Sequence, residues 1–153
     1  MAPFTASIAA MYQDGLLAHH RAPHNRRVID APTAVGARKN PVCGDDITVM
    51  VVLDTDAVGD TVRDVAFTGR GCSIATASAS MMTDAVTGLA VSEALAVADA
   101  VDRMLHASGA EASAESGLPP ALTPLLGVAP FPGRHGCAML PWQALREALT
   151  AKR

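Results

Sequence analysis

The 153-residue sequence has few aromatic side chains, few cysteines and no surplus of positive charge. Phe, Tyr and Trp together make up 3% of the chain while apolar residues make up 50%, so the core has to be built mainly from aliphatic side chains. With 12 basic and 15 acidic residues, the composition does not indicate a nucleic-acid-binding protein, and we expect no nucleic-acid partner.

Long apolar stretches are also missing. No run approaches the ~20 residues that a membrane-spanning helix needs, so we expect no membrane association. The first ten residues have neither a basic start nor a long apolar run, and therefore lack the pattern of an export signal. We expect a cytoplasmic protein.

A chain of this length is expected to form one domain, residues 1–153. Residues 47–53 and 61–68 have the composition and pattern of strands, and the short polar connection between them predicts an antiparallel hairpin. Residues 34–39 are a further candidate strand. Helices are predicted at 7–20, 73–87, 92–108 and 137–151. The predicted fold class is α+β: a small antiparallel sheet of about three strands packed with helices.

Three local features qualify this outline. Ser92, with Glu93 after it, is expected to cap the helix over 92–108. Residues 19–27 are rich in His and Arg and are predicted to form an exposed, solvated basic turn. Residues 111–133 form a Pro-rich insertion, predicted to be a loop within the domain with a short helix near 121–126.

The three cysteines are an odd number, which argues against a simple disulfide framework. Cys43 and Asp45 lie in a turn that contains Pro and Gly, and residues i and i+2 of an extended segment share a face. A thiolate and a carboxylate directed at one point suit zinc. A turn cysteine that merely neighbours an Asp would have the same spacing, so this pattern alone leaves both interpretations open.

Cys72 directly precedes the helix predicted over 73–87, and Cys137 begins the helix predicted over 137–151. A helix N-terminus stabilises a thiolate, so Cys72 is a candidate metal ligand or nucleophile. Together with Cys43 and Asp45, the two cysteines supply the three thiolates and one carboxylate of a tetrahedral zinc site. His135 is the main alternative ligand, because imidazole is a common zinc partner.

Three cysteine motifs follow one another along the chain: Asn40-Pro41-x-Cys43-Gly44-Asp45, Gly69-x-Gly71-Cys72-x-Ile74-x-x-Ala77-Ser78-Ala79-Ser80-Met81-Met82 and Arg134-x-x-Cys137-x-x-x-x-Trp142. Together with Tyr12, His19, Pro23 and Asn25 near the N-terminus, they resemble the SufU branch of the IscU-like iron–sulfur cluster assembly proteins. The Pro-rich insertion and Gly136, where IscU-type proteins usually carry a His, favour SufU over IscU.

The resemblance implies one Zn²⁺ per chain, held by the residues Cys43, Asp45, Cys72 and Cys137. It implies that Cys43 accepts persulfide sulfur from a SufS-type, PLP-dependent cysteine desulfurase, a His of which replaces Cys43 on the metal during docking. The sulfur would pass to a downstream sulfur acceptor or SufBCD-type scaffold. The chain would thus be an enzyme, a zinc-dependent sulfurtransferase.

Two alternatives remain open at the level of the sequence. The same ligands could hold a transient iron–sulfur cluster, which would make the chain an IscU-like scaffold for cluster assembly. The site could also be a structural zinc module without sulfur chemistry, in which case removal of the metal would unfold the protein.

Overall fold

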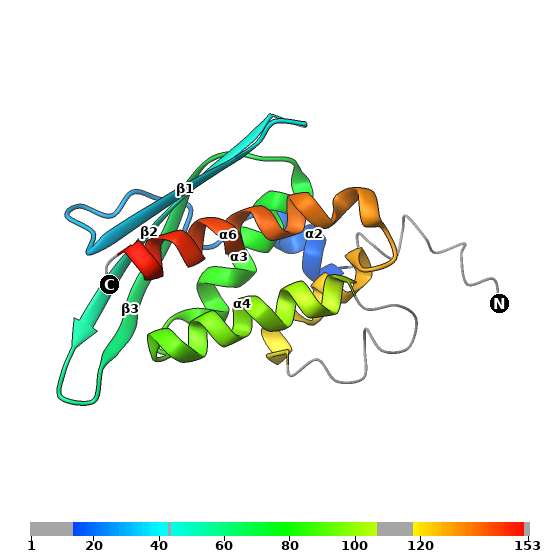
Figure 1. Ribbon diagram of the computed structural model, residues 1–153. Coiled ribbons are helices and arrows are strands. Elements are labelled where there is room, and N and C mark those ends of the chain that lie inside the picture. Colours follow the sequence, from blue (N-terminus) through cyan, green and yellow to red (C-terminus); the bar gives the residue numbers. More distant parts are fainter. Residues whose placement is uncertain (1–13, 43, 107–117, 152–153) are drawn as a thin grey trace.

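A three-stranded antiparallel sheet forms one layer of the computed structural model, which describes residues 14–42, 44–106 and 118–151 (Figure 1). The strand order is β1-β2-β3, and β2 and β3 form the predicted hairpin. Each strand extends beyond its predicted bounds, because backbone pairing continues into the polar residues that flank the apolar runs. The strands are β1 (Ala34–Asn40), β2 (Asp45–Thr55) and β3 (Asp60–Arg70).

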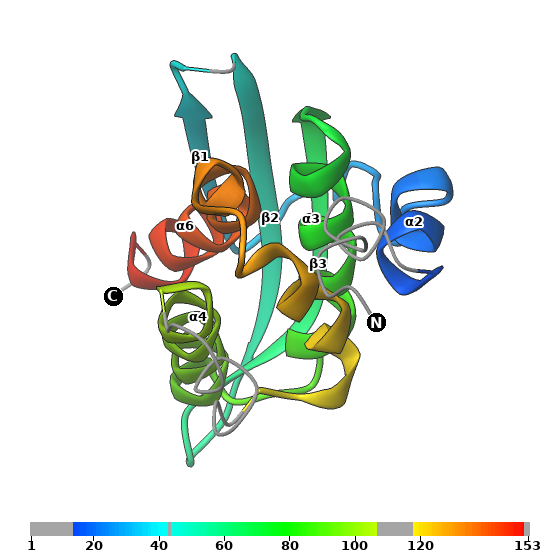
Figure 2. The ribbon, with the colours of Figure 1, turned by 90° about the vertical axis from the view of Figure 1, so that its right-hand side faces the viewer.

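The helices lie together on one side of this sheet, which confirms the α+β class (Figure 2). The C-terminal helix, residues 135–151, packs along β1 and β2. The helix over residues 73–86 packs against β3, and the helix over residues 14–21 packs on the helix over 73–86. The predicted part 7–13 of the first helix lies outside the described residues. The helices are α2 (Asp14–Arg21), α3 (Ser73–Val86), α4 (Val91–His106) and α6 (His135–Ala151).

The prediction that Ser92 caps α4 was wrong. The helix begins at Val91, which places Ser92 inside its first turn. The carboxylate of Glu93 accepts a hydrogen bond from the backbone N–H of Ala90 at 3.0 Å. Because this contact satisfies an N–H group at the helix start, the helix begins one residue before Ser92 and needs no hydroxyl cap there.

The core is a single cluster of mainly aliphatic side chains, as the composition required, with Trp142 and Phe67 as its largest aromatic members. Close contact between β1 and α6 depends on Gly36. A Cβ atom at this position would lie 2.0 Å from the carbonyl oxygen of Ala144 and 2.7 Å from the backbone nitrogen of Ala148. The absence of a side chain at Gly36 therefore lets the backbone of α6 rest directly on the strand.

The described part of the Pro-rich insertion is ordered structure rather than an open loop. It contains the 3₁₀ helices η2 (Pro120–Val128) and η3 (Pro132–Arg134), and η2 covers the short helix predicted near 121–126. Leu122, Leu125 and Val128 are fully buried, so η2 contributes to the core. Within the described ranges, no helix has both the length and the apolar character that crossing a bilayer requires.

Candidate metal centre

Asp45 begins β2, directly after the tight turn that joins it to β1. Asn40 shapes this turn: its backbone carbonyl accepts from the N–H of Gly44 at 2.7 Å and its side-chain oxygen accepts from the N–H of Val42 at 3.0 Å. Asp45 is only 7% exposed, and its buried Oδ2 atom has no hydrogen-bond partner among the described residues. A buried carboxylate oxygen of this kind is costly unless a cation pairs with it.

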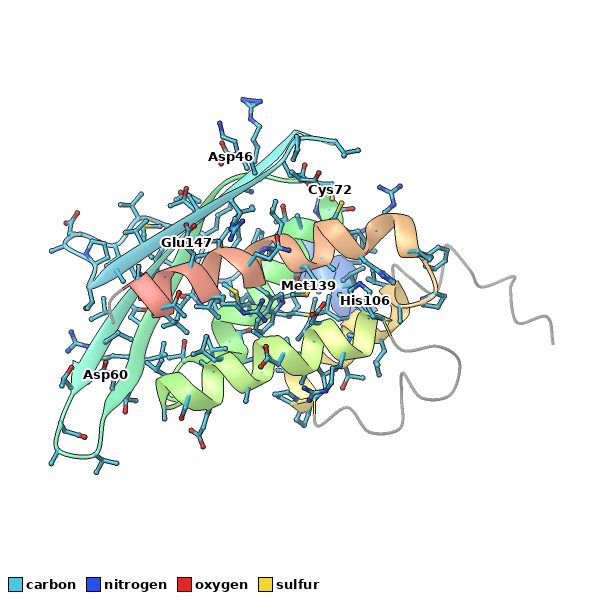
Figure 3. The ribbon with its side chains drawn as sticks, viewed as in Figure 1. Asp46, Asp60, Cys72, His106, Met139 and Glu147 are labelled. Carbon is cyan, nitrogen blue, oxygen red and sulfur yellow. The ribbon has the colours of Figure 1, made fainter. Side chains whose placement is uncertain are left out.

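Cys72 is the N-cap residue of α3 and lies in the short connection between β3 and this helix. Its sulfur accepts a hydrogen bond from the backbone N–H of Ala75 at 3.5 Å, and the side chain is half-buried. Figure 3 shows the Cys72 side chain near the first turns of α6. Cys72 therefore lies directly before the first residue of α3, where the sequence predicted it.

Gly69 allows the end of β3, just before Cys72, to lie close to the start of β2. Gly69 has a φ of 116°, and a Cβ atom here would lie 2.0 Å from the carbonyl oxygen of Asp46. Only glycine combines this backbone conformation with so short an approach. The end of β3 therefore lies against the residues that flank Asp45.

Cys137 completes the group from the first turn of α6, where it is 4% exposed. The helix starts two residues earlier than predicted, so Cys137 is its third residue and not its first. One potential ligand atom from each of Asp45, Cys72 and Cys137 lies within 4.8 Å of the others. The structure thus brings together three of the four predicted ligands, from a strand start and two helix starts; their role as ligands stays a prediction.

Cys43, the fourth predicted ligand, lies outside the described residues. Its chain neighbours Val42 and Gly44 are both described and exposed, and Gly44 has a φ of 77°. Cys43 belongs by sequence to the turn that ends at Asp45. Its role as ligand and sulfur acceptor stays a prediction.

His135, the alternative ligand, points elsewhere. Its Nε2 atom lies 2.8 Å from the carbonyl oxygen of Ala129, and its ring packs edge-on against His106 with the ring centroids 5.3 Å apart. Among the described residues, the group of potential ligands that contains Cys72 does not include His135. The hydrogen bond to Ala129 uses one ring nitrogen and directs the imidazole toward η2 and α4.

The three described side chains are chemically suited to zinc. Thiolates and a carboxylate are ordinary zinc ligands, and ligand atoms around a tetrahedral zinc lie roughly 3.5–3.8 Å apart, given bond lengths near 2.0 Å for oxygen and 2.3 Å for sulfur. The potential ligand atoms of Asp45, Cys72 and Cys137 lie within 4.8 Å of one another, so they are at most about an ångström farther apart than in such a site. A small side-chain rotation closes this difference. The unpartnered Oδ2 atom of Asp45 also needs a cation, so the donor set fits the metal.

A second group of potential ligands was missed at the level of the sequence. His19, His24 and Asp84 also offer one ligand atom each within 4.8 Å of the others. The sequence predicted only a solvated basic turn for 19–27, and Asp84 lies 60 residues beyond His24. No local pattern connects residues so far apart, so this group became visible only in the folded chain.

Comparisons with known proteins agree over almost the whole chain. The family model of the NifU-like N terminal domain matches residues 11–151. The chain is 42% identical over 139 residues to the iron-sulfur cluster assembly scaffold protein IscU of Streptococcus pyogenes serotype M1, covering 91% of this chain and 82% of that protein. It is 36% identical over 146 residues to the zinc-dependent sulfurtransferase SufU of Bacillus subtilis (strain 168), covering 95% and 94%.

A solved structure has the same fold. The crystal structure of FiSufU from Fervidobacterium islandicum AW-1, described as an iron-sulfur cluster assembly scaffold protein for the SUF system, superimposes with a TM-score of 0.76 at 27% identity. The match covers 91% of this chain and 96% of that chain. The sheet, the helices and their connections are therefore those of a known fold.

Proposed function

The chain belongs to the family of NifU-like N-terminal domains, and on that premise we propose that it is a zinc-dependent sulfur acceptor for iron–sulfur cluster assembly. The observation that carries the proposal is the convergence of Asp45, Cys72 and Cys137, with a buried Asp45 oxygen to which no described residue donates a hydrogen bond. The Bacillus subtilis relative, named a zinc-dependent sulfurtransferase, supports the same chemistry. The partner we propose is a SufS-type, PLP-dependent cysteine desulfurase.

The chain's residues divide into two roles in this proposal. Asp45, Cys72 and Cys137 are held by a strand start and two helix starts, and would form the fixed part of a site that Cys43 completes. Zinc, when bound, keeps its cysteine ligands deprotonated at neutral pH. The chain neighbours of Cys43, Val42 and Gly44, are both exposed, so we propose that a partner protein approaches the site at this segment.

The proposed reaction is a thiol–persulfide exchange. The thiolate of Cys43 attacks the outer sulfur of the desulfurase persulfide and forms a new S–S bond, while the S–S bond of the desulfurase breaks. Cys43 then carries the persulfide with its proton, and the desulfurase cysteine leaves as a thiolate, so atoms and electrons balance. The sulfur would pass to a downstream acceptor or a SufBCD-type scaffold, in the reducing cytoplasm, where free thiols persist.

The test is an assay of the desulfurase with and without the purified chain. Alanine release from cysteine should increase when the zinc-loaded chain is added, and Cys43→Ala should abolish the increase. Val58→Ala is the matched control, because Val58 is 95% exposed but lies at the β2–β3 turn, at the opposite end of β2 from Asp45. Stimulation that survives Cys43→Ala would refute the proposed acceptor role.

A second candidate function is an IscU-like scaffold, because the Streptococcus pyogenes relative carries that name and is 42% identical. In this case the same ligand group would hold a transient iron–sulfur cluster, which the chain would pass on. Anaerobic reconstitution with iron and sulfide, followed by visible absorption, separates the two functions. A stable cluster that displaces zinc and moves to an apo-protein would favour the scaffold over the sulfur acceptor.

A further inference from the structure

A cluster of two imidazoles and one carboxylate lies on the surface formed by α2 and α3. His19 is on α2, His24 follows that helix, and Asp84 is near the end of α3. His24 Nδ1 lies 2.6 Å from Asp84 Oδ2, and the two imidazole ring centroids are 4.7 Å apart. Asp84 is 12 residues beyond Cys72, or ~18 Å along a helix at 1.5 Å per residue, so the cluster is separate from the cysteine site.

The fully buried Ser80 holds both imidazole-bearing residues in place. Its Oγ atom accepts a hydrogen bond from the backbone N–H of His24 at 2.7 Å and lies 2.6 Å from Nδ1 of His19. This contact engages one ring nitrogen of His19 and leaves Nε2 as the nitrogen for an ion. Metal-bound histidines usually have their second ring nitrogen held by such a partner, which orients the ring.

The segment that carries His24 is itself tied to two other elements. The side chain of Asn25 donates to Thr83 Oγ1 at 2.9 Å, and the backbone carbonyl of Asn25 accepts from the N–H of Phe67 at 3.0 Å. Asn25 has a φ of 60°, a conformation that Asn tolerates better than most residues. Because these bonds fix the backbone next to His24, they hold its imidazole close to the position from which it would bind a metal ion.

We propose that His19, His24 and Asp84 form a second metal site, which takes a divalent first-row transition ion such as Zn²⁺ or Fe²⁺. Two imidazoles and one carboxylate are ligands that such ions share, and three protein ligands leave positions open for water. Ligand atoms around such an ion lie ~3.4 Å apart for bonds near 2.1 Å, so atoms up to 4.8 Å apart have to approach by roughly 1.4 Å at most. His24 Nδ1 and Asp84 Oδ2, which are 2.6 Å apart, have to separate by roughly 0.8 Å to admit the ion between them.

The exposure and protonation of the cluster suit an exchangeable ion. The side chains of His24 and Asp84 are 55% and 37% exposed, so an ion can enter from solvent without any movement of the core. Burial, and then the neighbouring His24, lower the pKa of His19, while Asp84 acts in the opposite direction. A neutral His19 can offer a nitrogen lone pair, and the single carboxylate supplies the negative charge.

Metal uptake by the full-length chain tests the proposal without reference to sulfur transfer. Isothermal titration with Zn²⁺ should show one more ion per chain in the wild type than in His24→Gln or Asp84→Asn. If a weakened site persists, its affinity should fall at least about tenfold, the loss that even a supporting residue of a metal site causes. The difference between variants reports on this cluster whether or not the cysteine site is filled.

His20→Gln is the matched control, because His20 is an exposed imidazole on the same helix, outside the cluster. It should leave the stoichiometry and affinity unchanged. In the wild type, Zn²⁺ should also shift the NMR signals of the His19 and His24 rings and leave those of His20 in place. Equal uptake of Zn²⁺ by the wild type, His24→Gln and Asp84→Asn would overturn the proposal. His24 and Asp84 would then be only a hydrogen-bonded pair of side chains on the surface.

Both variants are expected to fold, since His24 and Asp84 are exposed side chains. Thermal unfolding followed by circular dichroism verifies this before the titrations. If Asp84→Asn is unstable, His24→Gln alone still decides the outcome, because the backbone N–H bond from His24 to Ser80 does not depend on the imidazole.

Discussion

The indole N–H of Trp142 donates a hydrogen bond to the hydroxyl of Ser78 at 3.0 Å, inside the contact between α3 and α6. Ser78 in turn donates to the backbone carbonyl of Ala138 at 2.7 Å, and both side chains are fully buried. Ala138 is the residue after Cys137, and Ser78 is on the helix that Cys72 caps. This polar link therefore fixes the two cysteine-bearing helix starts relative to each other.

Ser78→Ala should lower the free energy of unfolding by about 1–3 kcal/mol, because the indole N–H and the Ala138 carbonyl lose their common partner in the core. Urea unfolding can be followed by the fluorescence of Trp142, the one tryptophan of the sequence. Ser92→Ala, at an exposed position on α4, should change the stability by less than about 0.5 kcal/mol. Equal stability of Ser78→Ala and the wild type would contradict this role.

Asp45→Asn should weaken zinc binding at least about tenfold, or ~1.4 kcal/mol, because a neutral amide replaces the buried carboxylate. Competition with a chromogenic chelator measures the affinity. Asp46→Asn is the matched control, since Asp46 is the next residue of β2 but is not part of the ligand group. Loss of affinity in both variants alike would point to general electrostatics instead of ligation.

Removal of the metal should lower the melting temperature without unfolding the chain. The aliphatic core is complete without any ion, so bound zinc adds only its binding free energy, about 2.7 kcal/mol when free zinc is 100-fold above the dissociation constant. Circular dichroism with and without a chelator measures the effect. An unfolded apo-protein would instead support the structural zinc module.

Gly36→Ala should destabilise the fold by about 1–3 kcal/mol, since the new methyl group meets the backbone of α6 and the helix has to move away from β1. Gly133→Ala is the control, because no atom of the described part of the chain lies within 4 Å of a Cβ atom at Gly133. Chemical denaturation of the two variants gives the comparison. If both variants lose the same stability, close packing of β1 and α6 is not the cause.

His19 should titrate below the ordinary histidine pKa of about 6.5 in metal-free protein, because burial, and then His24, disfavour its charged form. NMR titration of the ring signals measures this pKa. In His24→Gln one lowering influence is gone, so the pKa should rise toward 6.5; in Asp84→Asn a raising influence is gone, so it should fall further. A wild-type pKa above 6.5 would contradict the assigned causes.

The same shift has a consequence for stability. A depressed pKa means that the unfolded chain binds a proton to His19 more readily than the folded chain does. The contribution of His19 is therefore present above pH ~6.5 and is lost as the pH falls through the lower, folded-state value. Ser80→Ala is unsuitable for testing this point, because it also removes the hydrogen bond to the backbone of His24.

The fold class and the order of the elements follow from the sequence alone, and so do the motifs of the family. Strands and helices each require a local, periodic pattern of apolar residues along the sequence. These elements can therefore be predicted without the folded structure. The errors occurred at element ends, as at Ser92 and Cys137, where a capping contact or an added turn decides the boundary.

Contacts between residues far apart in the sequence depend on how the helices pack on the sheet. Cys72 and Cys137 are 65 positions apart, and they approach because α3 and α6 pack on one sheet and share the link between Ser78 and Trp142. The sequence motifs could suggest that these two cysteines act together, but nothing in 19–27 indicated a partner for His24. Asp84 reaches it because α2 packs on α3, and such contacts depend on the whole core rather than on any local pattern.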